Sequence, residues 1–173
     1  MRYEKLIEIA AAMKPGVIIE IGTHRGVRAS QLKHHCHTYY GFDLWEAGND
    51  ATDKRESNGK GRSTKQQAVQ ALAGCNFELI AGDTRETLPA FCKRGIKADF
   101  VFIDGGHSVE TIQSDWDAIK QILNLGAVVV FDDYYEPERA GFGCNSLVRR
   151  IQHTLLDGDT FDGTLIRLVK VQT

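Results

Sequence analysis

The stretch that most constrains the fold is VIIEIGTHRG, residues 17–26. Its consecutive β-branched residues predict a strand that is buried on both faces of a sheet. Glu20 places a charge at the carboxyl end of this strand, where the apolar run stops. Gly22 and Gly26 then allow a tight turn and a close approach of the backbone to a ligand. A helix that begins after such a turn offers N–H groups and a positive dipole end to an anionic or nucleotide ligand.

Further apolar runs follow this strand, and helical patterns separate them. The alternation predicts βαβ units with right-handed crossovers, and therefore an α/β fold with one doubly wound, mostly parallel sheet. Residues 3–13 place apolar side chains on one helical face, and Pro15 and Gly16 end that helix. The predicted later strands are residues 39–44, 77–81, 99–103 and 127–131, with two further strands near 155–159 and 164–171.

Three element boundaries are specific predictions. The helix over residues 84–93 is expected to be interrupted at Pro89. Ser108 is a good N-cap for the next helix, which we expect Gly126 to stop. The strand that follows, residues 127–131, would then end at the pair Asp132–Asp133.

Length and composition predict one domain over residues 1–173, with a mobile loop at about 47–64 that holds no large apolar residue. A net charge of -2 provides no basic field, so nucleic acid and anionic membrane are disfavoured as partners. The chain has no signal-peptide pattern and no apolar stretch of ~20 residues. The widely spaced cysteines are expected to be reduced thiols, which indicates a cytoplasmic protein.

Acidic residues mark the carboxyl ends of the predicted strands. In a wound parallel sheet, ligands bind outside those ends. Turn-forming aspartates would account for one or two of these acids, but not for one at every strand. We therefore predict a shared ligand site at this edge, lined by Glu20, Asp43, Asp83, Asp104 and the pair Asp132–Asp133.

The ordered segments EIGTHRG, GFDLW, AGDTRETLP, DFVFIDGGH and GAVVVFDDYY resemble the class I S-adenosylmethionine-dependent methyltransferases. The nearest branch is that of macrocin O-methyltransferase and the cephalosporin-hydroxylase-like small-molecule O-methyltransferases. The resemblance covers residues 15 to 135, and His24 stands where a middle glycine is usual. It implies a Rossmann-like methyltransferase fold, which we expect to have seven strands with an antiparallel C-terminal strand.

The resemblance also implies S-adenosylmethionine as cofactor. Backbone N–H groups around Gly22 to Gly26 would hold its carboxylate, and Glu20 would accept from its ammonium. Asp43 follows Gly22 at the spacing typical of a ribose-binding acid, and its two oxygens match two hydroxyls. Asp83 with Thr84 would lie at the adenine. The expected cofactor-binding residues are Glu20, Gly22, Thr23, His24, Gly26, Asp43, Leu44, Gly82, Asp83, Thr84 and Asp104.

Asp104, Asp132 and Asp133 should come together, because the fourth and fifth strands are expected to be neighbours. Three close carboxylates repel one another unless one is protonated or a cation lies between them. Oxygen ligands favour Mg²⁺ or Ca²⁺. The resemblance implies Mg²⁺, because in the resembled branch acids at these positions hold Mg²⁺ against vicinal hydroxyls of the acceptor. The plain alternative is that Asp132 caps a turn and Asp133 is solvated.

His107 follows a Gly-Gly pair at the same edge, and its ordinary pKa suits a general base. The alternative is a histidine at a helix start that hydrogen-bonds the backbone or supports the metal site. Asp104 and His107 are the expected catalytic residues.

The leading hypothesis is a metal-assisted O-methyltransferase for a small hydroxylated acceptor, with Mg²⁺ as a second cofactor. An NAD-dependent oxidoreductase is the first alternative, although the turn lacks GxGxxG. A nucleic-acid methyltransferase or a non-catalytic cofactor-binding module is the second, although the Pro-Cys and Asn-Pro-Pro dyads of base-methylating enzymes are absent. The sequence does not identify the acceptor, and it leaves open a homo-oligomer in which a second subunit completes the pocket.

Overall fold

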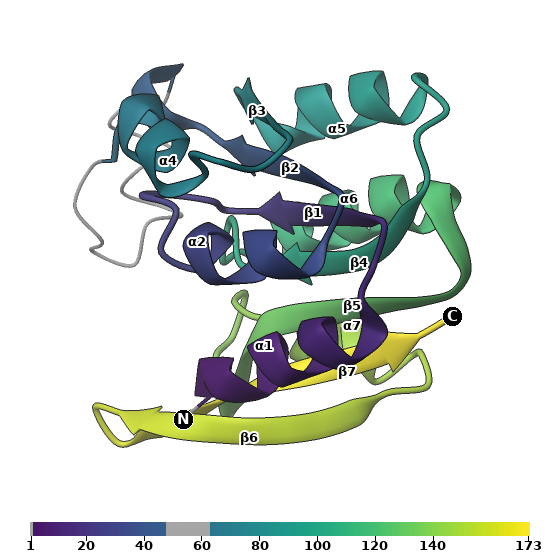
Figure 1. The fold of residues 1–173 in the computed structure, drawn as a ribbon. Helices are drawn as coiled ribbons and strands as arrows, with labels where there is room; N and C mark the ends of the chain where they lie inside the picture. The colour runs from purple at the N-terminus through teal and green to yellow at the C-terminus, as the bar shows by residue number, and fades with distance from the viewer. Residues whose placement is uncertain (1, 48–62) are drawn as a thin grey trace.

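A computed structural model describes residues 2–47 and 63–173 of the chain. It contains a seven-stranded sheet in the order β3-β2-β1-β4-β5-β7-β6. The first five strands pair in parallel, and β7 runs antiparallel to β5 and to β6. The predicted doubly wound sheet with an antiparallel C-terminal strand is therefore confirmed (Figure 1).

The strands are β1 (Val17–Ile21), β2 (Thr38–Asp43), β3 (Phe77–Ala81), β4 (Ala98–Ile103), β5 (Leu123–Glu136), β6 (Thr154–Phe161) and β7 (Thr164–Gln172). The α-helices are α1 (Arg2–Met13), α2 (Ala29–Leu32), α4 (Lys65–Ala71), α5 (Thr84–Cys92), α6 (Val109–Ile119) and α7 (Asn145–Val148). Short 3-10 helices are η1 (Lys33–His35), η2 (Trp45–Ala47) and η3 (Lys120–Ile122).

Helices cover both faces of the sheet, and two apolar cores result. Neighbouring strand residues point to opposite faces, so Ile18 joins one core and Ile19 the other. The core with Ile18 lies under α1, α2 and α4, and the core with Ile19 lies under α5, α6 and α7. Because β1 and β4 are buried on both sides, they read in the sequence as continuous apolar runs.

The strand register aligns the carboxyl ends of the parallel strands. Ile21 of β1 pairs with Phe42 of β2 and with Ile103 of β4, and Ile103 pairs with Phe131 of β5. The residues that follow these partners therefore lie in one row along the sheet. This is the edge at which the sequence predicted a ligand site.

Three boundary predictions are wrong. Helix α5 continues through Pro89 to Cys92, although this proline lies inside the helix and removes one intrahelical hydrogen bond, because Leu88 and Phe91 on either side of it are buried in the core. Helix α6 ends at Ile119, and β5 already begins at Leu123, so Gly126 lies inside the strand. Asp132 and Asp133 likewise lie within β5, which runs on to Glu136 and pairs with β7 beyond them.

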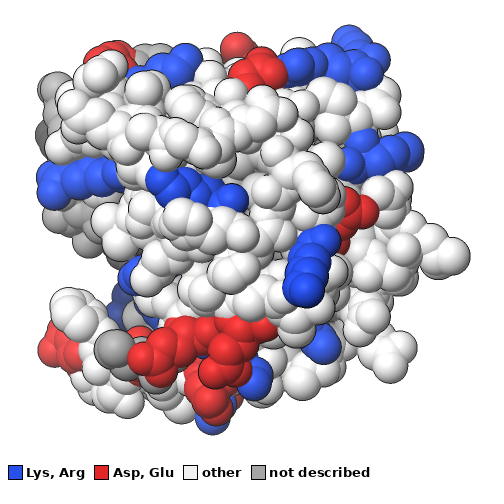
Figure 2. All heavy atoms as spheres, viewed as in Figure 1, with Lys and Arg blue, Asp and Glu red and all other residues white. Residues whose placement is uncertain are grey.

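The four cysteines are free thiols. Among the residues that the structure describes, no helix has the length and apolarity to cross a membrane. On the face in Figure 2, Lys and Arg are scattered, and acidic side chains gather at the lower edge, where α1 and β6 lie. The predicted mobile loop at 47–64 falls largely on residues 48–62, which lie outside the described residues.

Candidate functional site

The turn after β1 is pressed against the end of β4. Gly22 has a φ of 92°, and a Cβ placed there would lie 2.0 Å from the carbonyl oxygen of Asp104. The backbone N–H of Asp104 donates to the carbonyl of Ile21 over 2.8 Å. Only glycine satisfies both the dihedral and the space, so Gly22 brings the turn after β1 directly beside Asp104. Because the cofactor is predicted to bind at this turn, we call residues 22–28 the cofactor turn.

The turn is held by its own hydrogen bonds. The N–H groups of Gly22 and Thr23 donate to the carbonyl of Phe42 over 2.8 and 3.1 Å, and that of Gly26 donates to Thr23 over 2.8 Å. Gly26 is also enclosed, since a Cβ there would lie 2.6 Å from the Cβ of Ala71. These internal bonds fix the shape of the turn, and the predicted binding of a cofactor carboxylate by its N–H groups stays a prediction.

Asp43 connects the cofactor turn to the segment after β2. Its Oδ2 accepts the backbone N–H of His24 over 2.7 Å, and its Oδ1 accepts that of Trp45 over 3.1 Å. The indole Nε1 of Trp45 donates in turn to the carbonyl of His24 over 2.7 Å. An ionised carboxylate has further acceptor positions on each oxygen, so these contacts orient Asp43 without exhausting it.

Glu20 is buried beneath the row of strand ends. The Tyr39 hydroxyl donates to its Oε2 over 2.5 Å. Burial raises the pKa of Glu20 to about 7, although the hydrogen bond from Tyr39 opposes the shift. A carboxyl group with this pKa changes its charge near neutral pH, and a cationic ligand would favour its ionised form.

The adenine-side candidates lie at the start of α5. Asp83 is the N-cap of this helix and accepts the backbone N–H of Arg85 over 2.9 Å, while its carboxylate also pairs with the Arg85 guanidinium. The N–H of Gly82 donates to the carbonyl of Asp43 over 3.0 Å. Thr84 is the first residue of α5, and Leu44 directly follows β2. Asp83 therefore caps α5, and its predicted contact with the adenine stays a prediction.

A β-bulge in β5 separates the two neighbouring aspartates. The register against β7 shifts between Phe131 and Tyr134, and Asp133 has a φ of 63°. The backbone N–H of Asp133 donates to Oδ1 of Asp132 over 2.7 Å. Bulges re-aim side chains, and this one gives the two carboxylates different partners.

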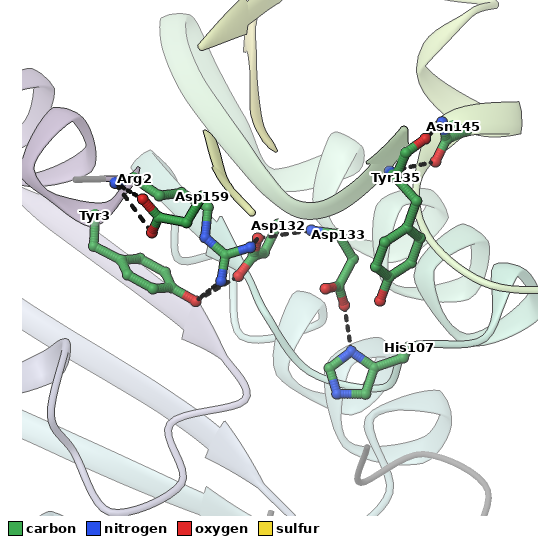
Figure 3. Close-up of polar contacts among 8 residues, drawn as sticks. All are labelled: Arg2, Tyr3, His107, Asp132, Asp133, Tyr135, Asn145 and Asp159. Atoms are coloured by element: carbon green, nitrogen blue, oxygen red, sulfur yellow. Dashed lines mark hydrogen bonds and ion pairs between the residues drawn. The ribbon is translucent and has the colours of Figure 1, made fainter. Parts of the chain in front are cut away.

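Asp133 bonds His107. Oδ2 of Asp133 contacts Nδ1 of His107, and both side chains are buried (Figure 3). The carbonyl of His107 accepts the N–H of Gly143 over 2.9 Å, and the carbonyl of Asp133 accepts the N–H of Cys144 over 3.1 Å. The segment before α7 thus clamps the histidine and the bulge to each other.

Asp132 faces the first turn of α1 instead. The Tyr3 hydroxyl donates to its Oδ2 over 2.6 Å, and Nη1 of Arg2 lies 2.9 Å from its Oδ1 (Figure 3). Burial and the charge of Asp133 raise the pKa of Asp132, and the charge of Arg2 opposes that shift. The guanidinium of Arg28, from the cofactor turn, lies 3.7 Å from the centre of the Tyr3 ring.

Asp132 and Asp133, which were predicted to bind magnesium, have partners within the chain. Among the described residues, no group of three His, Cys, Asp or Glu side chains is arranged to hold a metal ion. Asp132 instead binds Arg2 and Tyr3, and Asp133 binds His107. In this arrangement the donor set does not fit Mg²⁺.

Sequence reasoning missed Arg2, Tyr3 and Tyr39 as partners of the acids. Tyr3 fits the apolar face of a helix and Tyr39 a buried strand, so nothing local marks either hydroxyl as a donor to a distant carboxylate. The contact between Tyr3 and Asp132 joins residues 129 positions apart, and only the packing of α1 creates it.

Comparison with known proteins identifies a family model that matches the chain. Residues 19–134 match the family model described as a methyltransferase domain. A search of curated protein sequences finds no significant match.

Several solved structures share the fold. The O-methyltransferase TomG from Streptomyces achromogenes, in complex with SAM, is 17% identical with a TM-score of 0.73, over 98% of this chain and 78% of that one. An O-methyltransferase from Bacillus cereus in complex with SAH is 14% identical with a TM-score of 0.70, over 98% and 80%. An rRNA methylase from Streptococcus thermophilus is 14% identical with a TM-score of 0.69, over 99% and 96%.

At these identities, the solved structures show a common fold. The family model spans more than half of the chain and includes the strands from β1 to most of β5. The chain therefore belongs to the methyltransferase domain family, which confirms the family that the ordered motifs indicated.

Proposed function

We propose that the chain transfers a methyl group from S-adenosylmethionine to a hydroxyl group of a small molecule. The observation that carries this proposal is the buried contact between His107 and Asp133. His107 lies in the loop after β4, which Asp104 begins, and Asp133 lies in β5. O-methyl transfer requires removal of the hydroxyl proton, and a histidine oriented by a carboxylate is suited to that task.

The hydrogen bond between His107 and Asp133 has a defined direction. The carboxylate of Asp133 accepts a hydrogen bond, so the proton of neutral His107 is favoured on Nδ1 and the lone pair on Nε2. Nε2 would then accept the proton from the acceptor hydroxyl, and Asp133 would stabilise the imidazolium that forms. The bulge and Gly143 fix both side chains in advance, which limits the loss of freedom on binding.

The cofactor, when bound, supplies the electrophilic methyl group. Asp43 at the end of β2 is suited to the ribose hydroxyls, because both of its oxygens are already oriented by backbone N–H groups. Glu20 would offer a negative charge to the ammonium group. The position of Gly22 against Asp104 brings the cofactor turn beside the strand end that precedes His107.

The sequence hypothesis included magnesium assistance. The positions of the acids give it no support, because Asp132 already forms an ion pair with Arg2. No step of the proposed reaction depends on a metal ion. The cytoplasmic location and a homo-oligomer stay predictions from the sequence.

The test of this function is calorimetric titration with S-adenosylmethionine, S-adenosylhomocysteine and NADH. We expect micromolar-range binding of the first two, none of NADH, and a loss of at least about tenfold in affinity for Asp43→Ala. The matched control is Asp117→Ala, which removes an exposed carboxylate of α6 paired with Lys120. Flat traces for both sulfur compounds would reject the proposal, and binding of NADH alone would favour an oxidoreductase.

A further inference from the structure

Asp132 has a cation of its own. The side chain of Arg2 is 13% exposed and that of Asp132 is 2% exposed, and their ion-pair distance is 2.9 Å. The Tyr3 hydroxyl donates to the other carboxylate oxygen and accepts from Nη2 of Arg2 over 2.7 Å. With the N–H of Asp133 on Oδ1, both oxygens of Asp132 are bound from within the chain.

The charge of Arg2 acts on the whole group of acids. Burial lowers the pKa of Arg2, but Asp132, followed by Tyr3, Asp104 and Asp133, outweighs burial and raises its pKa overall. The guanidinium therefore lies in the field of all three carboxylates that were candidates for a metal site. A positive charge stabilises the ionised form of a buried carboxylate, and Arg2 supplies that charge to Asp132.

The first turn of α1 is held in place by contacts at both sides. The backbone N–H of Arg2 donates to the Asp159 carboxylate of β6, over 3.3 and 3.4 Å to its two oxygens (Figure 3). Leu6 and Ala10 anchor the helix in the core. Arg28 covers the Tyr3 ring from the cofactor turn. The cation is thus positioned by packing on α1, β6 and the turn after β1.

We propose that the Arg2 guanidinium is the resident counter-cation of Asp132 in this group of acids, and that it takes the place of a divalent metal at this site. Arg2 is a positioning residue, since it acts through Asp132 and Tyr3. It neutralises Asp132 and leaves Asp133 to orient His107. The inference rests on the proposed function only for the identity of the site, because its test measures metal binding and charge coupling rather than methyl transfer.

A double-mutant cycle in the full chain tests the coupling. Arg2→Met removes the charge at similar length and leaves a buried carboxylate uncompensated, so Tm should fall by roughly 10 °C. The double variant Arg2→Met/Asp132→Asn removes both charges and should recover at least half of that loss. If Arg2→Met does not fold, a double variant that does fold would support the coupling equally. A double variant whose loss in Tm equals the sum of the losses of the two single variants would overturn the proposal.

Two further variants separate charge from packing. Arg2→Lys keeps the positive charge, and its Tm should stay within about 5 °C of the wild type. A loss as large as that of Arg2→Met would mean that shape rather than charge matters, and it would overturn the proposal. Lys5→Met is the matched control, because it removes an exposed cation of the same helix that pairs with Glu8. Its Tm should change by no more than about 2 °C.

Mn²⁺ serves as the probe for a metal site. The paramagnetic resonance signal of free Mn²⁺ should remain unchanged when wild-type protein is added, with and without S-adenosylhomocysteine, up to about millimolar metal. Stoichiometric binding that Asp132→Asn abolishes would show a metal at this site and overturn the proposal. Failure here would leave the binding of S-adenosylmethionine, and so the proposed function, untouched.

Discussion

The two neighbouring aspartates of β5 have different partners, although they have the same chemistry. Asp132 bonds Tyr3 and Arg2, whereas Asp133 bonds His107. In a regular strand, consecutive side chains point to opposite faces, but both of these carboxylates lie at the strand-end edge. The left-handed φ of Asp133 makes this arrangement possible, and it divides charge neutralisation from histidine orientation.

The role of His107 gives a prediction at the level of the residue. His107→Asn should lower the rate of methyl transfer at least about 100-fold, because the imidazole nitrogen proposed to accept the hydroxyl proton would then be missing. The affinity for S-adenosylmethionine should stay within about twofold, since the histidine is assigned to the acceptor. Release of S-adenosylhomocysteine over a panel of phenols, catechols and sugars measures the rate, and calorimetry measures the affinity.

The control for this variant is His153→Asn. His153 lies before β6 and contacts the carbonyl of Ile151, so its replacement should leave both quantities unchanged. A His107→Asn enzyme with the wild-type rate would mean that another group, or water, takes the proton. A joint loss of rate and cofactor binding would instead point to collapse of the loop after β4.

At the level of elements, the site depends on how the segment before α7 folds back over β5. Asn145 bonds the N–H and the carbonyl of Tyr135 with its side-chain amide, each over 3.0 Å, as a neighbouring strand would. Gly143 approaches the bulge so closely that a Cβ would lie 2.4 Å from the carbonyl oxygen of Asp133. The bulge is therefore enclosed by backbone, which keeps Asp133 against His107.

Two glycines of this segment provide a matched pair for a test. Gly141 and Gly143 have φ values of 77° and 83°, but an added Cβ at Gly141 would meet nothing within 4 Å. Gly141→Ala should therefore cost only the left-handed strain, about 1–2 kcal/mol. Gly143→Ala should cost about 3 kcal/mol or more, because Asp133 and Tyr135 must move.

Urea denaturation of both variants measures the difference in the free energy of unfolding. Equal losses would mean that the segment yields freely and does not hold the bulge. The prediction also has a local consequence, since displacement of Asp133 in Gly143→Ala should alter the imidazole chemical shifts of His107, while Gly141→Ala leaves them near the wild-type values.

At the scale of the whole molecule, periodicity was sufficient to predict the parallel strands of the sheet, whereas the antiparallel C-terminal strand was expected from the family resemblance. Apolar runs such as residues 99–103 gave the buried strands, and the acids after them gave the edge at which the site lies. The length of β5 was not predictable, because Asp132 and Asp133 look like a strand end in the sequence. The strand continues past them because β7 pairs with Tyr134 and Tyr135, a contact distant in sequence. Arg2 and Tyr3 were missed for the same reason.

Glu20 connects the predicted ligand site to the stability of the fold, because it is buried in β1 between β2 and β4. Its pKa of about 7 in the folded protein exceeds the ordinary value of 4.5. The folded state therefore binds this proton more tightly than the unfolded chain does. The contribution is fully present below pH 4.5 and is lost as the pH rises through 7, by about 3 kcal/mol in total.

Glu20→Gln should remove this dependence, since the amide oxygen can still accept the Tyr39 hydroxyl but carries no charge at any pH. The ligand-free wild type should lose stability relative to this variant between pH 5 and 8, and the variant should be the more stable protein at pH 8. The difference between their Tm values across that range isolates Glu20 from the other titrating groups. The exposed Glu110→Gln should follow the wild-type profile. Parallel profiles for wild type and Glu20→Gln would contradict the prediction, because they would mean that Glu20 titrates alike in the folded and the unfolded protein.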